Sequence, residues 1–297
     1  MKRISLVKPL QIISLLLVSL SLHFSVSAQT AEEFGAVINL SGKQRMLTQK
    51  MSKEVMLVAL DIEKQSNLNN LAKTSSLFDK TLMGLRDGDS GLGLPATESK
   101  RILRQLKKID AKWQAFYPNI KTILANNTVE QAQLDAIGTQ NLPLLKEMNK
   151  AVGAYEKEAA KGGMKADPGL AASLNLSGKQ RMLTQKMSKE FLMVAHGYDV
   201  VNNRLNLLET YTLFERTLSG LSKGDETLGL PPTTNADINT QLDVVKDLWQ
   251  EAKPVFERAS KDAYTPTSDD IKVVAKLNLP LLKEMNKAVG MYEQLAK

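Results

Sequence analysis

Residues Asn39–Glu54 read NLSGKQRMLTQKMSKE, and residues Asn175–Glu190 read the same sixteen letters at an offset of 136. The repeat extends beyond this segment, because a second motif, NLPLLKEMNKAVG, occurs at both Asn141–Gly153 and Asn278–Gly290. Self-similarity at a fixed spacing is the sequence signature of a duplicated structural unit. The chain therefore contains two copies of one module.

Within each copy the apolar residues follow the spacing of an α-helix. Leu40, Leu47, Met51 and Val58 share one helical face, and no stretch alternates polar and apolar residues over the length of a strand. The pattern predicts an all-α protein of two tandem up-down-up-down four-helix bundle modules. The expected helices are 31–65, 67–86, 96–125 and 128–161 in copy one and 170–201, 205–221, 235–260 and 268–297 in copy two.

The N-terminal segment and a central linker set the expected boundaries. Residues 1–28 combine early cations with an uncharged apolar run, which is typical of a signal peptide cleaved after Ala28. Its retention as a membrane anchor is the alternative. Module copies are expected at 31–161 and 170–297, joined by a linker rich in glycine and proline at 162–169. A cleaved signal peptide predicts a periplasmic or secreted protein.

Local signals also mark individual helix ends. Three glycines and a proline within 88–95 are expected to separate the second helix of copy one from the third. Thr128 with Gln131 has the pattern of a capping box that opens the fourth helix. Pro118 and Pro143 fall inside helical stretches, so we expect them to bend or interrupt their helices.

Charge and residue content narrow the function classes. Without residues 1–28 the chain has 36 Lys and Arg against 32 Asp and Glu, a net charge of +4, which is small for a dedicated nucleic-acid binder. The chain has no cysteine, and His196 is its one histidine beyond the signal peptide, so neither a zinc site nor a His-dependent triad is expected. We expect no catalytic residues, no metal and no cofactor.

The first-helix motif contains an arginine without an acidic neighbour. Arg45 has Gly42 about one turn before it and Gln49 one turn after it, and no carboxylate lies within 39–53. A buried, unpaired arginine would cost several kcal/mol. The guanidinium must therefore find a carboxylate elsewhere or bind an anion, and its planar fork of donors suits a small oxyanion.

Specific residues can be named for both alternatives, a carboxylate partner and a bound anion. Glu147 and its copy Glu284 could form ion pairs with Arg45 and Arg181 inside each bundle, or the arginines could hold a ligand.

Other repeated residues are interpreted more simply. We expect Lys43, Lys50 and Lys53 to be solvated, and we expect the core to include Met46, Met51, Met148, Trp113 and Trp249.

Residues 38–49, INLSGKQRMLTQ, resemble the signature of the PilJ/NarX-like sensor domain. This domain is the periplasmic part of type IV pilus chemotaxis transducers and of nitrate and nitrite sensor kinases, and the resemblance covers both copies. It implies four-helix bundles that pair through their first helices, with one arginine from each helix holding the anion. The ligand-binding residues that it implies here, with one glutamine added from each helix, are Gly42, Arg45, Gln49, Gly178, Arg181 and Gln185.

Two functional hypotheses follow. The first is an exported, non-catalytic sensor-type protein that captures a small anion, such as nitrate or nitrite, between the first helices of an intrachain pseudo-dimer or a homodimer. The alternative is a ligand-free interaction protein that docks through an exposed face of Lys43, Lys50 and Lys53. Because no second apolar segment follows residue 28, we expect a membrane sensor, pilus or envelope protein to be the signalling partner.

Overall fold

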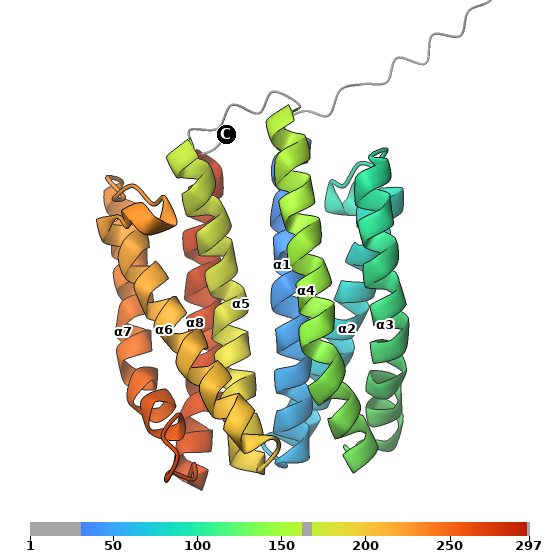
Figure 1. The fold of residues 1–297 in the computed structure, drawn as a ribbon, viewed down its shortest axis with the longest axis vertical. Coiled ribbons are helices and arrows are strands. Elements are labelled where there is room, and N and C mark those ends of the chain that lie inside the picture. Colours follow the sequence, from blue (N-terminus) through green and yellow to red (C-terminus); the bar gives the residue numbers. More distant parts are fainter. Residues whose placement is uncertain (1–30, 162–167, 296–297) are drawn as a thin grey trace, which may run out of the picture.

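Eight α-helices, four in each copy of the repeat, form the described residues 31–161 and 168–295 of the computed structural model (Figure 1). Copy one contains α1 (Ala31–Ala59), α2 (Lys64–Asp87), α3 (Lys100–Asn126) and α4 (Gln131–Lys161). Copy two contains α5 (Pro168–His196), α6 (Val200–Lys223), α7 (Ala236–Ala259) and α8 (Ser268–Leu295). The predicted all-α, two-module fold is confirmed. The expected signal peptide and residues 162–167 of the expected linker lie outside the described residues.

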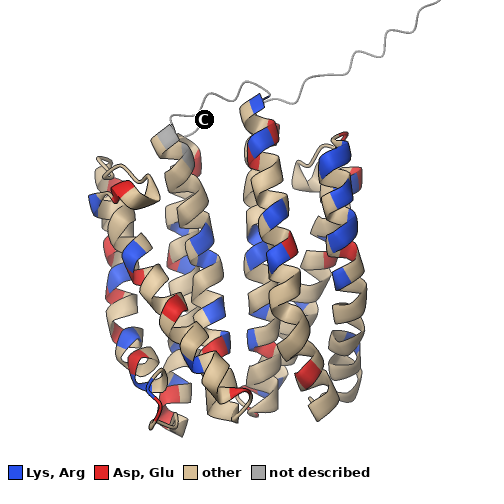
Figure 2. Ribbon diagram, viewed as in Figure 1, with Lys and Arg blue, Asp and Glu red and all other residues tan. Residues whose placement is uncertain are grey.

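Each copy folds as a four-helix bundle, and the two bundles pack through their first helices. Consecutive helices are neighbours within a copy, and the fourth packs back against the first. α1 and α5 lie side by side in the centre of the molecule, while α3 and α7 lie at its opposite edges (Figure 1). Figure 2 shows that Lys and Arg are concentrated in the first half of α3.

The glycines expected to end helices do so. Gly88 follows α2 with a φ of 86°, which is a conformation that glycine adopts without strain. Gly224 follows α6 with the same φ. A short 3-10 turn comes next in each copy, at Ser90–Leu92 and at Glu226–Leu228. The predicted break between the second and third helices is therefore present in both copies.

The start of α4 differs from the prediction, and of the two outcomes expected at the prolines, interruption of the helix does not occur. α4 begins at Gln131, and the backbone N–H of Glu130 donates to the Gln133 side chain, so one half of a capping box forms two residues beyond the expected Thr128 box. Pro118 and Pro143 do not interrupt α3 and α4, which continue through both positions. Packing against neighbouring helices offsets the hydrogen bond that each proline removes.

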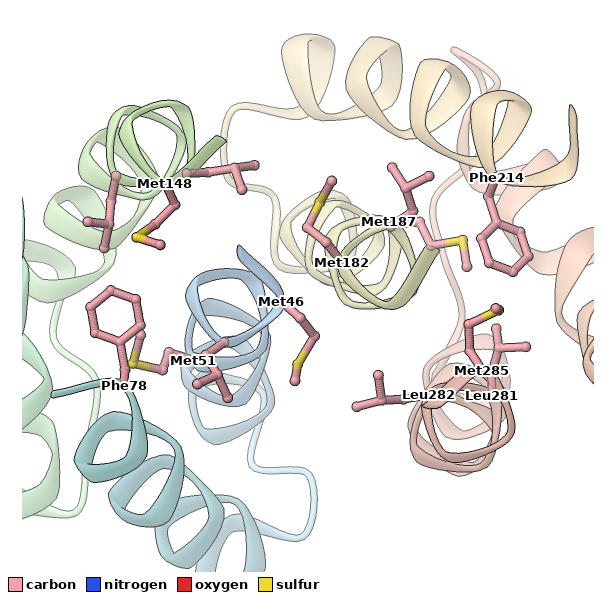
Figure 3. Close-up of a cluster of buried hydrophobic side chains, with 14 of the residues drawn as sticks. Met46, Met51, Phe78, Met148, Met182, Met187, Phe214, Leu281, Leu282 and Met285 are labelled. Atoms are coloured by element: carbon pink, nitrogen blue, oxygen red, sulfur yellow. The ribbon is translucent and has the colours of Figure 1, made fainter. Parts of the chain in front are cut away.

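The core residues are as expected. Figure 3 shows Met46, Met51 and Met148 pointing among the helices, and each is at most 3% exposed. Trp113 and Trp249 are buried in the centres of the two bundles, where each contacts other aromatic rings. No helix within the described residues combines the length and the apolar character needed to cross a bilayer.

Candidate functional site

The repeated first-helix motif is enclosed by three helices in each copy. α1 packs against α2, α4 and α5, and α5 packs against α6, α8 and α1. This enclosure buries polar residues that a surface helix would expose, including Gln44, Thr48 and Gln49, each at 0% exposure. Packing on every side therefore explains why polar as well as apolar letters recur in the motif.

Arg45 and Arg181 meet at two glycines in the interface between α1 and α5. Both arginines are buried, at 6% and 5% exposure. A Cβ atom placed on Gly42 would lie 3.5 Å from Nη2 of Arg45 and 3.8 Å from Nη2 of Arg181. The corresponding distances from Gly178 are 3.9 Å to Arg45 and 3.6 Å to Arg181. The absence of side chains on the two glycines thus lets both guanidinium groups approach the same part of the interface.

The guanidinium groups bond mainly across the interface, to asparagines of the opposite copy. Arg181 donates from Nη2 to Oδ1 of Asn39 at 3.0 Å, and Arg45 donates from Nη2 to Oδ1 of Asn175 at 3.5 Å. Arg181 also reaches Oδ1 of Asn286 through Nη1 at 3.5 Å. The Nε atom of each arginine is buried without a hydrogen-bond partner. Each guanidinium therefore retains donor capacity that the described residues leave unused.

The alternative in which Glu147 and Glu284 form ion pairs with the arginines is wrong. Glu147 accepts hydrogen bonds from Gln105 and Lys150, which hold the pKa of its carboxyl below the usual range, and Glu284 has the equivalent bonds. The two carboxylates lie outside the interface because they face the third helix of their own copy. Glu147 and Glu284 are therefore not the carboxylates that balance the charge of the arginines.

The carboxylates that act on the arginines are Glu156 and Glu293, near the ends of α4 and α8. Burial raises the pKa of Glu156, and the charge of Arg45 opposes that rise. Burial lowers the pKa of Arg181 to about 10. The charge of Glu293 opposes this lowering, and the charge of Arg45 adds to it. Sequence reasoning missed these residues, although a repeated Tyr-Glu pair follows the second motif in both copies.

Two lysines add positive charge near the arginines. Burial lowers the pKa of Lys43, and the nearby charge of Arg181 lowers it further. Lys179 is affected in the same way by burial and by Arg45. Among the described residues, the site therefore gathers four cations around two carboxylates. This excess of positive charge in a desolvated interface favours a bound anion.

The expectation that Lys50 and Lys53 are solvated is wrong. Lys53 is 2% exposed and donates to Oδ1 of Asn278 in the opposite copy at 2.9 Å, and burial lowers its pKa to about 8. Lys50 is half-buried and pairs with Glu54 and Thr74. Lys43 is half-buried as well. The exposed lysine face that the docking hypothesis needs is therefore absent from the described surface of α1.

Gln49 and Gln185 lie one turn beyond the arginines on the same helices. Both are fully buried, and each donates from Nε2 to the neighbouring threonine hydroxyl, at 3.0 Å to Thr48 and 3.2 Å to Thr184. Their Oε1 atoms have no partner. Of the six predicted ligand-binding residues, the structure brings the two glycines and two arginines together and places the glutamines beside them. Within the described residues, no cluster of His, Cys, Asp and Glu is arranged to hold a metal ion.

Comparisons with known proteins agree with a duplicated module. The family described as "PilJ: Type IV pili methyl-accepting chemotaxis transducer N-term" matches residues 27–139 and 166–271, one segment in each copy and together more than half of the chain. No protein of curated function matches the chain. Among solved structures, the ligand-binding domain of the P. aeruginosa nitrate receptor McpN is similar at 24% identity and a TM-score of 0.37. That similarity covers 42% of this chain and 97% of the receptor domain.

Proposed function

The chain belongs to the family of type IV pilus chemotaxis transducer N-terminal domains, and on that premise we propose that it is an exported sensory protein that binds one small oxyanion between α1 and α5. Nitrate and nitrite are the anions we favour. The role is binding and presentation of the bound state, without catalysis. The convergence of Arg45 and Arg181 at two glycines carries the proposal.

The geometry supports a small and planar anion. Two guanidinium forks approach from opposite helices, and each presents coplanar N–H donors that match the oxygens of a planar oxyanion. The glycine surfaces leave little space beyond the arginine nitrogens, which disfavours bulky ligands. Since Arg45 and Arg181 belong to one chain, the pseudo-dimer needs no second subunit to complete the site.

Anion capture also offsets an electrostatic cost. Burial lowers the pKa of both arginines, which means that the fold disfavours their charged forms. A bound anion would neutralise part of that charge and draw α1 and α5 together. The resulting change at the interface between the modules is the signal that we propose is presented to a membrane sensor, pilus or envelope partner.

Thermal unfolding with a panel of anions tests the proposal. The protein is unfolded with nitrate, nitrite, acetate or sulfate at matched ionic strength, beside the variant Arg45→Gln/Arg181→Gln. A ligand at 100 times its dissociation constant adds about 2.7 kcal/mol to stability. We expect nitrate or nitrite to raise the unfolding temperature of the wild type and to have no effect on the variant.

The matched control is Arg101→Gln/Arg104→Gln, which removes the same charge from the exposed surface of α3. This control should keep the full anion-dependent shift. The proposal fails if no anion of the panel stabilises the wild type. It also fails if the stabilisation survives in Arg45→Gln/Arg181→Gln.

A further inference from the structure

The two copies carry opposite charges on corresponding outer helices. The first thirteen residues of α3 contain six exposed cations, which are Lys100, Arg101, Arg104, Lys107, Lys108 and Lys112. At the offset of 136, the equivalent residues of α7 are Ala236, Asp237, Thr240, Asp243, Val244 and Leu248. Each cation of copy one is thus replaced by an acidic or uncharged residue in copy two. Since the copies share one fold, packing does not require this difference.

The cations of α3 lie on one face of the helix. Lys100, Arg104, Lys107 and Lys108 are spaced by four, seven and eight residues, which places them on a single face, here called the basic face. Like charges at these spacings repel one another and destabilise a helix. Within the described residues, no hydrogen bond or ion pair relieves that repulsion for Lys100, Arg104 or Lys107.

The matching side of α7 carries a stripe of acidic residues, and the exposed Lys246 lies beside it. Asp243, Asp247 and Glu251 are exposed and spaced by four residues, so they form a second stripe, here called the acidic face. The offset relation aligns Asp243 with Lys107 of the basic face. Asp247 and Glu251 align with Ala111 and Ala115, one and two turns further along α3. The two faces therefore lie on corresponding sides of α3 and α7 and carry opposite charge, and they overlap at the pair Lys107 and Asp243.

The two faces cannot meet within one chain. α3 lies at one edge of the row of helices and α7 at the other, with both first helices between them (Figure 1). Figure 2 shows the positive charge of α3 at the edge of the molecule. A contact between the basic face and an acidic face of the same kind therefore requires a second copy of the chain.

A shallow groove beside α3 extends the positive surface. It lies between α3 and α4 and is lined by Arg101, Lys150 and Lys157, with Gly153 and Ala154 also contributing. The small residues keep the groove open between the long cationic side chains. Acidic side chains of a partner helix could enter it while that helix runs along α3.

We propose that the basic face of α3 binds the acidic face of α7 on a second copy of this chain, so that chains associate head to tail in a row. This contact is heterologous, because different surfaces of the two molecules meet, and it leaves a free face at each end for further chains. The contact depends on attraction between surface charges, which salt screens, so it weakens as ionic strength rises. It does not depend on the anion site.

Sedimentation velocity of the protein expressed from its full sequence tests the proposal. The wild type is compared at about 20 mM and 300 mM salt, where the screening length differs severalfold. Two variants reverse one face each: Arg104→Glu/Lys107→Glu/Lys108→Glu, and Asp243→Lys/Asp247→Lys/Glu251→Lys. All six positions are exposed, and circular dichroism verifies that each variant folds.

We expect the wild type to associate at low salt and to be monomeric at high salt. Each single-face variant alone should remain monomeric at low salt, because its two faces then carry the same sign. Mixing the two variants, or combining all six substitutions in one chain, should restore association. A wild type that is monomeric at low salt overturns the proposal, even if the basic face then binds vesicles of anionic lipid. Association that persists in either single-face variant also overturns it.

Discussion

Arg181 donates a hydrogen bond from Nη2 to Oδ1 of Asn39 at 3.0 Å, which joins residues 142 positions apart across the interface between α1 and α5. Arg45 makes the reciprocal but longer contact with Asn175. Each copy of the motif thus supplies an arginine to its own helix and an asparagine to the opposite arginine. The duplication places in one chain the paired arrangement that separate modules would need two chains to form.

Replacing the buried arginines should stabilise the protein when no anion is bound. The lowered pKa of each arginine means that burial disfavours its charge, and the effect is larger at Arg181. We expect Arg181→Gln to raise the free energy of unfolding by about 1 to 3 kcal/mol in anion-free buffer. Arg45→Gln should raise it by less. Urea unfolding in dialysed buffer measures both, and a loss of stability in both variants would contradict this electrostatic account.

Gly42→Ala/Gly178→Ala should weaken anion binding while stabilising the fold. The added Cβ atoms would make ordinary contacts with the arginine nitrogens, so the helices can keep their positions. Alanine is favoured over glycine in a helix by about 1 kcal/mol. The methyl groups would nevertheless occupy the space between the guanidinium groups, and we expect affinity for nitrate to fall at least about tenfold, or about 1.4 kcal/mol.

Gly153→Ala/Gly290→Ala is the matched control for this pair. Both glycines lie in helices, and no atom approaches their Cβ positions within 4 Å. Stability should rise as in the first pair, whereas anion affinity should not change. Equal affinity in both pairs of variants would show that the anion does not sit between Gly42 and Gly178.

The stability of the protein should rise with pH above about 8. Burial lowers the pKa of Lys53 and of Lys189 from 10.5 to about 8 in the folded state. Between these values the unfolded chain binds more protons than the folded chain, so the free energy of unfolding increases as pH rises from 8 to 10.5. The gain is on the order of a few kcal/mol. Urea unfolding at several pH values should show that this gain is largely lost in Lys53→Met/Lys189→Met. The gain should remain in the control variant Lys112→Met. An unchanged pH profile in Lys53→Met/Lys189→Met would be evidence against buried, charged lysines.

Asn141→Leu should destabilise the interface between the modules. The Asn141 side chain donates to the Thr48 carbonyl at 2.8 Å and to Ser52 Oγ at 2.7 Å, and it accepts from Lys189 at 3.2 Å. Its loss leaves a buried ammonium without that acceptor, at a cost of about 2 kcal/mol or more. The cost should be smaller at pH 10, where the lysine is mostly neutral. Asn149→Leu, at an exposed position of the same helix, should have little effect in the same unfolding experiment.

The sequence was sufficient to predict the fold and the residues that meet at the centre of the candidate site, while ligand binding by these residues stays a prediction. An exact repeat of the motif predicted two modules, and the helical spacing of apolar residues predicted their helices. The spacing of Gly42 and Arg45, repeated at Gly178 and Arg181, indicated that the arginines act at a close approach between helices. The sequence alone can show a pair of this kind, because glycine lowers the stability of a helix and a buried arginine lowers the stability of the fold unless they have a role.

The partners of those residues were harder to infer. Glu147 and Glu156 lie nine positions apart on α4, and only the packing of that helix decides which of them lies near Arg45. Lys53 looked like a surface residue because lysine usually is one. Its burial follows from the enclosure of α1 by three helices, including one from the other copy, and a helical periodicity within one segment cannot reveal that enclosure.

Titration calorimetry with nitrate, on the wild type and on the single variants Arg45→Gln and Arg181→Gln, tests the central claim most directly. If both arginines hold the same anion, the wild type binds one nitrate per chain and each single variant loses that binding. Two nitrates per chain, or binding that either variant retains at wild-type affinity, would contradict a shared site between α1 and α5.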